Sequence, residues 1–222
     1  MKIKQYFFER FSEYNDSDDR YRLGNRILYN MVNQYPGNKD YNQIVAKMWI
    51  IGRTYAAAVE RRPNKEETPG EFYYDYVAPT IANGRLDRMI KRIKSKKYSE
   101  INKKSIRDVL LIHKYLVDQI KGITEKEKRS LASKYLHFHL PKLVFIYDSR
   151  VAGSIGKFVG KCPSNLILDE YDEVYAKFVF KAYEIYKAIK EIKFKSRHGD
   201  TLPRVVDNFL LRESDSDSAE ED

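Results

Sequence analysis

The stretch from Lys121 to Val151 holds the residues whose types and spacing are best suited to chemistry. Gly122 breaks a helical pattern, Thr124-Glu-Lys-Glu127 has the form of a capping box that starts a second helix, and that helix ends before Pro141. Two helices joined in this way can present backbone N–H groups to a phosphate. The apolar link 143–147 then leads to Asp148 and Ser149, either of which can cap a further helix, so we expect the Asp148 carboxylate at a fixed point beside the helix pair.

Basic side chains are concentrated in two segments, which points to an anionic partner. The segment 85–107 has ten basic residues against two acidic ones, and the segment 177–197 has seven against two. Basic residues on a helix face neutralise phosphates and release counterions, although a solvated surface has the same composition. We expect the first segment to contact nucleic acid through Lys91, Arg92, Lys96 and Lys97.

The order and approximate spacing of Gly122, Ala132, Pro141 and Asp148 resemble the helix-hairpin-helix DNA glycosylase superfamily. The resemblance covers roughly residues 101–158 and is greatest to the 8-oxoguanine DNA glycosylase type. The sequence departs from the pattern at Thr124, where the family has the second hairpin glycine, and the hairpin is about two residues longer.

The resemblance implies an enzyme that flips a damaged or modified base out of double-stranded DNA and cleaves its N-glycosidic bond. Asp148 would stabilise the positive charge that develops on the sugar. In bifunctional members a lysine is the nucleophile: counting back from Pro141 gives Lys128, and counting forward from Gly122 gives Lys126. A monofunctional enzyme that uses water fits equally well, and Asp148 can also be a simple N-cap worth ~1 kcal/mol.

The remaining site predictions concern DNA contacts and the pocket for the base. Within the resemblance, Gly122, Thr124 and Arg150 would contact the DNA. Tyr147, Trp49 and His137 are candidates for the base pocket, although Trp49 lies in an apolar stripe typical of a core and a structural role suits at least one of His137 and His139.

Two other classes of function remain open. One is a DNA-binding protein on the same fold that recognises modified bases without catalysis. The other is a helical toxin or nuclease-like factor, which lacks support because the sequence shows neither an acidic triad nor an Arg-x-x-x-x-His pair. No Walker loop, dinucleotide fingerprint or zinc motif appears, and we expect no cofactor and no metal. Repair of the cell's own DNA and defence against modified phage DNA are both compatible with these predictions.

The surrounding sequence predicts an all-α fold that positions these residues. Helical periodicity covers 40–60, 80–96, 103–121, a segment ending at about Leu140, 168–193 and a short segment from Pro203, with two further helices in the first forty residues. Residues 62–79 are predicted to form a loop because Pro63, Pro69, Gly70 and Pro79 interrupt them.

Charge divides the chain into a basic body and an acidic end. The last ten residues carry six acidic residues and no basic one, and the other residues have a net charge of +15. We therefore predict a helical glycosylase-type domain over 1–212 and a disordered acidic tail over 213–222. The single cysteine and the absence of an 18-residue apolar run indicate a cytoplasmic protein with no membrane contact. With DNA as its expected partner it would be nucleoid-associated, and we expect a monomer.

Overall fold

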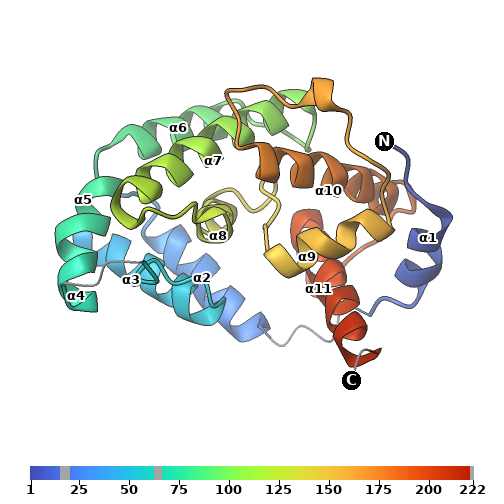
Figure 1. The fold of residues 1–222 in the computed structure, drawn as a ribbon, viewed down its shortest axis with the longest axis horizontal. Coiled ribbons are helices and arrows are strands. Elements are labelled where there is room, and N and C mark those ends of the chain that lie inside the picture. The colour runs from blue at the N-terminus through green and yellow to red at the C-terminus, as the bar shows by residue number, and fades with distance from the viewer. Residues whose placement is uncertain (16–20, 63–66, 221–222) are drawn as a thin grey trace.

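The computed structural model describes residues 1–15, 21–62 and 67–220 (Figure 1). Within these ranges the regular structure is helical, and the one β pairing is an isolated antiparallel bridge between Ile3 and Val159. The predicted all-α fold class is therefore confirmed. The same ranges contain no helix that is both long enough and apolar enough to cross a membrane.

The buried apolar residues of the described helices form one cluster that extends from Phe7 to Leu210. The α-helices are α1 (Gln5–Ser12), α2 (Arg22–Gln34), α3 (Tyr41–Thr54), α4 (Pro69–Phe72), α5 (Ala78–Ile81), α6 (Arg85–Ser95), α7 (Lys103–Thr124), α8 (Arg129–His139), α9 (Ser149–Ser154), α10 (Glu173–Glu191) and α11 (Leu202–Glu220). A π-helix, Tyr73–Val77, joins α4 to α5, and 3-10 turns lie at Ile155–Lys157 and Ser164–Leu166.

Helix α8 is the central helix of the fold and lies in the middle of Figure 1. Every residue from Leu131 to Leu140 is buried, and the helix packs against α2, α3 and α7. The buried set includes polar side chains, which are costly to bury unless they are hydrogen-bonded. His137, for example, contacts the carbonyl oxygen of Val144 at 2.8 Å and the hydroxyl of Tyr29 at 2.6 Å.

The connection between α7 and α8 differs from the predicted hairpin. Helix α7 continues through Gly122 to Thr124, and the left-handed residue that ends it is Glu125, with φ 56°. Thr124 does not cap the next helix, because its buried hydroxyl donates to the carbonyl oxygen of Ile120. Helix α8 starts at Arg129 without a side-chain cap. The predicted glycine stop and capping box are therefore wrong, because the apolar stripe of α7 extends one turn further, through Ile120 to Thr124.

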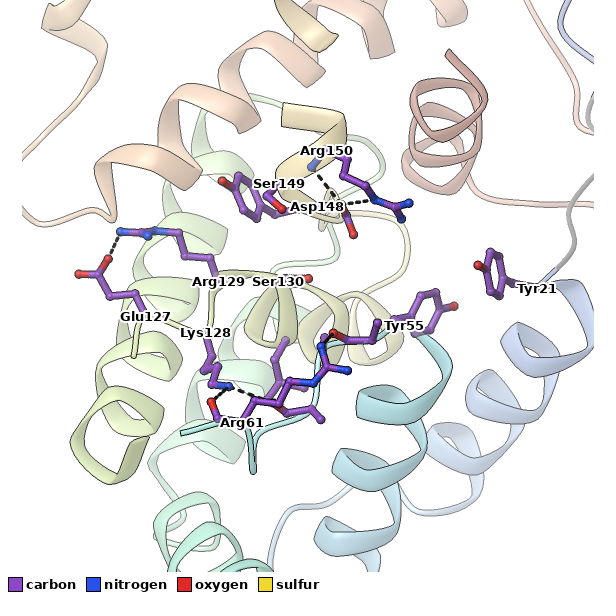
Figure 2. Close-up of a pocket in the computed structure, with 15 residues that line it drawn as sticks. Tyr21, Tyr55, Arg61, Glu127, Lys128, Arg129, Ser130, Asp148, Ser149 and Arg150 are labelled. Atoms are coloured by element: carbon purple, nitrogen blue, oxygen red, sulfur yellow. Dashed lines mark hydrogen bonds and ion pairs between the residues drawn. The ribbon is translucent and has the colours of Figure 1, made fainter. Parts of the chain in front are cut away.

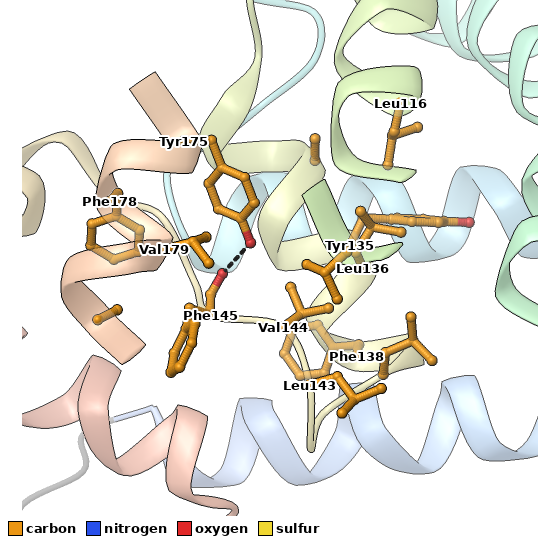
Figure 3. Packing of buried hydrophobic residues seen from close by; sticks show 14 of the residues in the cluster. Leu116, Tyr135, Leu136, Phe138, Leu143, Val144, Phe145, Tyr175, Phe178 and Val179 are labelled. Carbon is orange, nitrogen blue, oxygen red and sulfur yellow. Dashed lines mark hydrogen bonds between the residues drawn. The ribbon is translucent and has the colours of Figure 1, made fainter. Parts of the chain in front are cut away.

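The apolar link 143–147 is confirmed as a buried, non-helical connection between α8 and α9. Figure 3 shows Val144 and Phe145 packed among side chains of α8 and α10. The hydroxyl of Tyr175 donates to the carbonyl oxygen of Phe145 at 2.8 Å, and the N–H of Tyr147 donates to Ser133 Oγ at 2.9 Å. These bonds fix the backbone immediately before Asp148.

The segment predicted as the loop 62–79 is partly helical. Pro63 lies outside the described residues. Pro69 occupies a first-turn position of α4, where a missing N–H costs no helical hydrogen bond, whereas Pro79 lies in α5 directly after the π-helix. The predicted helix 80–96 is divided in two at Gly84, whose φ is 76°. The predicted helix 40–60 ends earlier, at Thr54, and the residues that follow it lead into the site described below.

Helix α11 continues to Glu220, so the described part of the segment 213–222, which was predicted to be disordered, is helical. Residues 221–222 of the predicted tail lie outside the described residues. The side chain of Glu213 is only 4% exposed, and its two oxygens accept from Arg10 Nε at 2.8 Å and Arg10 Nη2 at 3.3 Å. Composition alone could not anticipate this pair, because Arg10 lies on the first helix of the chain.

Candidate functional site

A cavity of about 690 Å³ opens where three chain segments meet (Figure 2). The first follows α3, the second starts α8 and the third starts α9, and Tyr21 adds one side chain from the residue before α2. The volume falls within the usual range for small-molecule sites. The lining residues are Tyr21, Tyr55, Ala56, Ala57, Ala58, Arg61, Glu127, Lys128, Arg129, Ser130, Leu131, Tyr147, Asp148, Ser149 and Arg150.

Asp148 lies at the start of α9 and caps that helix, as the sequence predicted. Its Oδ1 accepts from the backbone N–H of Arg150 at 3.1 Å, and the Nε of Arg150 lies 3.4 Å from the same oxygen. The side chain is 17% exposed, toward the cavity. The second oxygen, Oδ2, is held by a lysine that sequence reasoning did not assign to the site.

That lysine is Lys134, on α8. Its Nζ lies 3.3 Å from Asp148 Oδ2 and donates to Ser130 Oγ at 2.7 Å, and its side chain is only 3% exposed. The ammonium also lies 5.4 Å from the centroid of the Tyr55 ring. A usable signal was present in the sequence, because a lysine on the buried face of a helix needs polar or charged partners for its ammonium.

The charges around Asp148 decide its protonation state. Burial alone raises the pKa of the carboxyl, but the charges of Lys134 and Arg150 and the Arg150 N–H outweigh it, so the pKa is lowered overall. Burial lowers the pKa of Lys134, and the charges of Asp148 and Asp207 oppose that shift. Asp148 is therefore a carboxylate at neutral pH, at the edge of a cavity rich in cations.

Of the two lysines predicted as nucleophiles, only Lys128 lines the cavity. Its Nζ donates to the carbonyl oxygens of Arg61 at 2.6 Å and Ala58 at 3.0 Å, and burial lowers its pKa to about 8. Lys126 is exposed and outside the lining residues. Of the two lysines that counting along the sequence left as equal candidates, Lys128 lines the cavity and Lys126 does not.

Aromatic side chains form part of the cavity wall. The rings of Tyr21 and Tyr55 are stacked, with centroids 5.9 Å apart and an interplanar angle of 28°. Tyr147, predicted for the base pocket, also lines the cavity, and its ring packs edge-on against Phe178. A flat, aromatic ligand would find stacking surfaces here.

The other two residues predicted for the base pocket lie elsewhere. Trp49 is 52% exposed on α3 and does not line the cavity, so neither the pocket nor the core role predicted for it is found. Its helix buries Met48 and Ile51 instead, which turns Trp49 outward. His137 is fully buried inside α8 and is held by Tyr29 and Val144.

The predicted DNA contacts are brought together only in part. Arg150 lines the cavity, whereas Gly122 and Thr124 belong to α7, so the hairpin on which their assignment depended is not formed. The basic residues predicted on and just after α6 are outside the cavity as well, and Lys96 is paired with Asp108 at 2.6 Å. The residues of that group are Lys91, Arg92, Lys96 and Lys97, and all of them are exposed.

The cationic groups that do line the cavity are Arg61, Lys128, Arg129 and Arg150. Arg129 is held by Asp172, with Nε 2.8 Å from the carboxylate, and also pairs with Glu127. Arg61 and Arg150 extend into solvent. Within the described ranges, no group of three or more His, Cys, Asp and Glu residues is arranged to hold a metal ion.

Comparison of the chain with protein-family models, with curated proteins and with solved structures finds no match. The glycosylase resemblance therefore depends on the residues alone, and the function has to be argued from the geometry of the cavity.

Proposed function

We propose that this protein binds double-stranded DNA at the cavity and excises a damaged or modified base by cleaving its N-glycosidic bond. One observation carries the proposal: an ionised carboxylate, Asp148, is fixed at the edge of a cavity that has aromatic walls and basic residues around it. This combination suits a reaction that develops positive charge next to a polyanion.

The chemistry assigns a simple role to each group. The bond between C1′ and the base nitrogen breaks, its electron pair leaves with the base, and positive charge develops on the sugar. The carboxylate of Asp148 stabilises that charge. Water then adds at C1′ and loses a proton, while the departing base gains one. The tyrosine rings provide stacking surfaces for the extruded base.

A lyase step extends the proposal, with Lys128 as the amine that forms a bond to C1′ while the bond from C1′ to the base breaks. An amine with a pKa of about 8 has a substantial neutral fraction near pH 8, which is the form that attacks a carbon centre. The two carbonyl oxygens that bind its Nζ leave one donor position of the ammonium for other partners. Trapping with borohydride would identify the covalent adduct, and Lys128→Gln should abolish it while Lys126→Gln retains it.

The proposal is tested with duplex oligonucleotides that each contain one modified base. After incubation, alkali cleaves any strand that has lost its base, so breaks at one position identify both the activity and its substrate. Breaks without alkali indicate a lyase. An absence of breaks with every base would contradict the proposal.

A second candidate function is recognition of modified DNA without catalysis. The contacts of Asp148 favour this alternative. Both carboxylate oxygens already have partners within the protein, which is what a purely structural N-cap requires. Tight binding to one modified duplex, with no loss of the base, would support this alternative.

A further inference from the structure

Lys134 occupies an unusual place for a charged side chain. It lies on the central helix α8, is buried on all sides, and yet its Nζ reaches Asp148 at the edge of the cavity. Lys134 itself does not line the cavity, whereas its two polar partners, Ser130 and Asp148, both do. The ammonium thus lies directly behind the side of the cavity that carries the carboxylate.

The packing of this region does not need a charge. A methionine has a similar length and would fill the space in α8 without the cost of removing an ammonium from water. A methionine would not neutralise the charge of Asp148. Among the described contacts, Lys134 is the one side chain that donates to Asp148 Oδ2.

We propose that Lys134 is a positioning residue of this site, which keeps the Asp148 carboxylate ionised and directed toward the cavity. The inference depends on the proposed function only for its catalytic consequence. Lys134 acts through Asp148 and touches no reacting atom, which distinguishes it from Lys128.

Several charged groups surround the pair and set its electrostatic balance. Arg150, on α9, adds positive charge on the solvent side of Asp148. From α11, Asp207 adds negative charge near Lys134 and is itself paired with the buried Arg204 at 2.9 Å. Helix α11 packs closely on α9, so these groups lie behind the cavity. Two carboxylates therefore act on the ammonium of Lys134, and of these Asp148 contacts it and lines the cavity.

The first experiment needs no enzymatic activity. The pKa of Asp148 is measured by NMR titration of the carboxyl carbons, with the resonance assigned from the Asp148→Asn variant. In Lys134→Met the pKa of Asp148 should rise by roughly one unit or more, because a cation within about 4–6 Å has been removed. In Lys134→Arg, which keeps the charge, it should stay low. An unchanged pKa in folded Lys134→Met would overturn the inference.

Lys47→Met is the matched control. Lys47 is another buried lysine, with its Nζ 2.6 Å from the carbonyl oxygen of Gly37, away from the residues that line the cavity. Its replacement should lower stability and leave the pKa of Asp148 unchanged. If Lys134→Met does not fold, Lys134→Gln takes its place, because glutamine carries no charge but keeps an NH2 group that can donate to a polar neighbour.

The second experiment measures the catalytic consequence with the substrate found for the wild-type protein. In Lys134→Met, single-turnover excision should slow at neutral pH because the carboxylate, still ionised there, loses the contact that directs it toward the cavity. The acidic limb of the pH profile should move to higher pH with the pKa of Asp148. Lys134→Arg should restore the profile in part. If the wild-type protein excises no base, the proposed function is wrong, and the titration alone decides the role of Lys134. If Lys134→Met keeps the wild-type rate and pH profile, Lys134 is not a positioning residue.

Discussion

Asp148 combines two tasks that make different demands on its side chain. As the N-cap of α9 it needs only an oxygen that accepts the N–H of Arg150, and an asparagine supplies that equally well. As a group that stabilises a cationic sugar it needs its negative charge. The two tasks are therefore separable by a substitution that keeps the shape and removes the charge.

Asp148→Asn is expected to reduce excision by roughly 10²–10³-fold, because the reaction loses one preorganised electrostatic interaction. Binding to DNA should not weaken, since a negative charge next to phosphates is removed. The free energy of unfolding should fall by about 1–3 kcal/mol, because buried Lys134 loses a charged hydrogen-bond partner. Single-turnover assays, binding titrations and urea unfolding measure the three effects.

Asp40→Asn provides the control for this substitution. Asp40 caps α3 by accepting from the N–H of Gln43 at 3.0 Å and lies outside the cavity. It should change neither excision nor binding, and its effect on stability should be small because asparagine caps as well as aspartate does. If Asp148→Asn excises bases at the wild-type rate, Asp148 is a structural cap and the mechanism proposed here is wrong.

The elements around Asp148 show what the sequence could and could not reveal. The buried link, Pro141 and the cap at Asp148 were predictable because apolar runs, proline and N-caps act locally. The end of α7 was not, because Glu125 adopts a left-handed conformation that non-glycine residues seldom take. Lys134 was missed for a related reason: its partner Asp148 is 14 residues away and becomes a neighbour only when α8 and α9 pack.

Gly122→Ala distinguishes the continuous helix from the predicted hairpin. In the structure Gly122 is inside α7 and an added Cβ would meet no atom within 4 Å, so alanine should stabilise the protein by about 0.5–1 kcal/mol. A glycine that ended the helix with a positive φ would instead lose stability on replacement. Thermal and urea unfolding decide between the two signs.

Gly84→Ala is the reference for the opposite outcome. Its φ is 76°, a conformation that alanine adopts only with strain, so this variant should be destabilised. A loss of stability in Gly122→Ala similar to that in Gly84→Ala would show that α7 ends at Gly122 and would restore the hairpin.

Helix α11 leads to a prediction about truncation. A protein that ends at Arg212 loses Glu213 and leaves the guanidinium of Arg10 without its bidentate partner, at a cost of about 1–3 kcal/mol. A protein that ends at Ser216 keeps that pair and should unfold close to the wild-type temperature. Glu213→Gln in the full chain isolates the charge from the length of the helix. Equal melting temperatures for the two truncated proteins would mean that the Arg10 pair contributes nothing.

At the scale of the whole molecule, two pairs of exposed basic residues differ in their position relative to the cavity. Arg61 and Arg150 extend from the cavity that contains Asp148, whereas Lys91 and Arg92 lie on α6, outside the cavity. Both pairs are exposed and can neutralise phosphates, and Arg150 would do so beside Asp148, 3.4 Å from its Oδ1. The two pairs differ in their distance from the Asp148 carboxylate. The affinity for DNA that is bound over the cavity should therefore depend more on Arg61 and Arg150 than on Lys91 and Arg92.

Salt dependence of DNA binding measures that difference. If duplex DNA binds over the cavity, log K should fall linearly with log salt, with a slope of roughly −0.9 for each neutralised phosphate. Removing Arg61 and Arg150 together (R61Q/R150Q) should weaken binding and make the slope shallower by roughly two contacts, or about 1.8. The matched variant K91Q/R92Q loses the same net charge and should change the slope less, because its side chains are not at the cavity. A larger effect of K91Q/R92Q than of R61Q/R150Q would mean that DNA binds along α6 and not over the cavity that contains Asp148. If the affinity of the wild-type protein does not change with salt, DNA is not its partner.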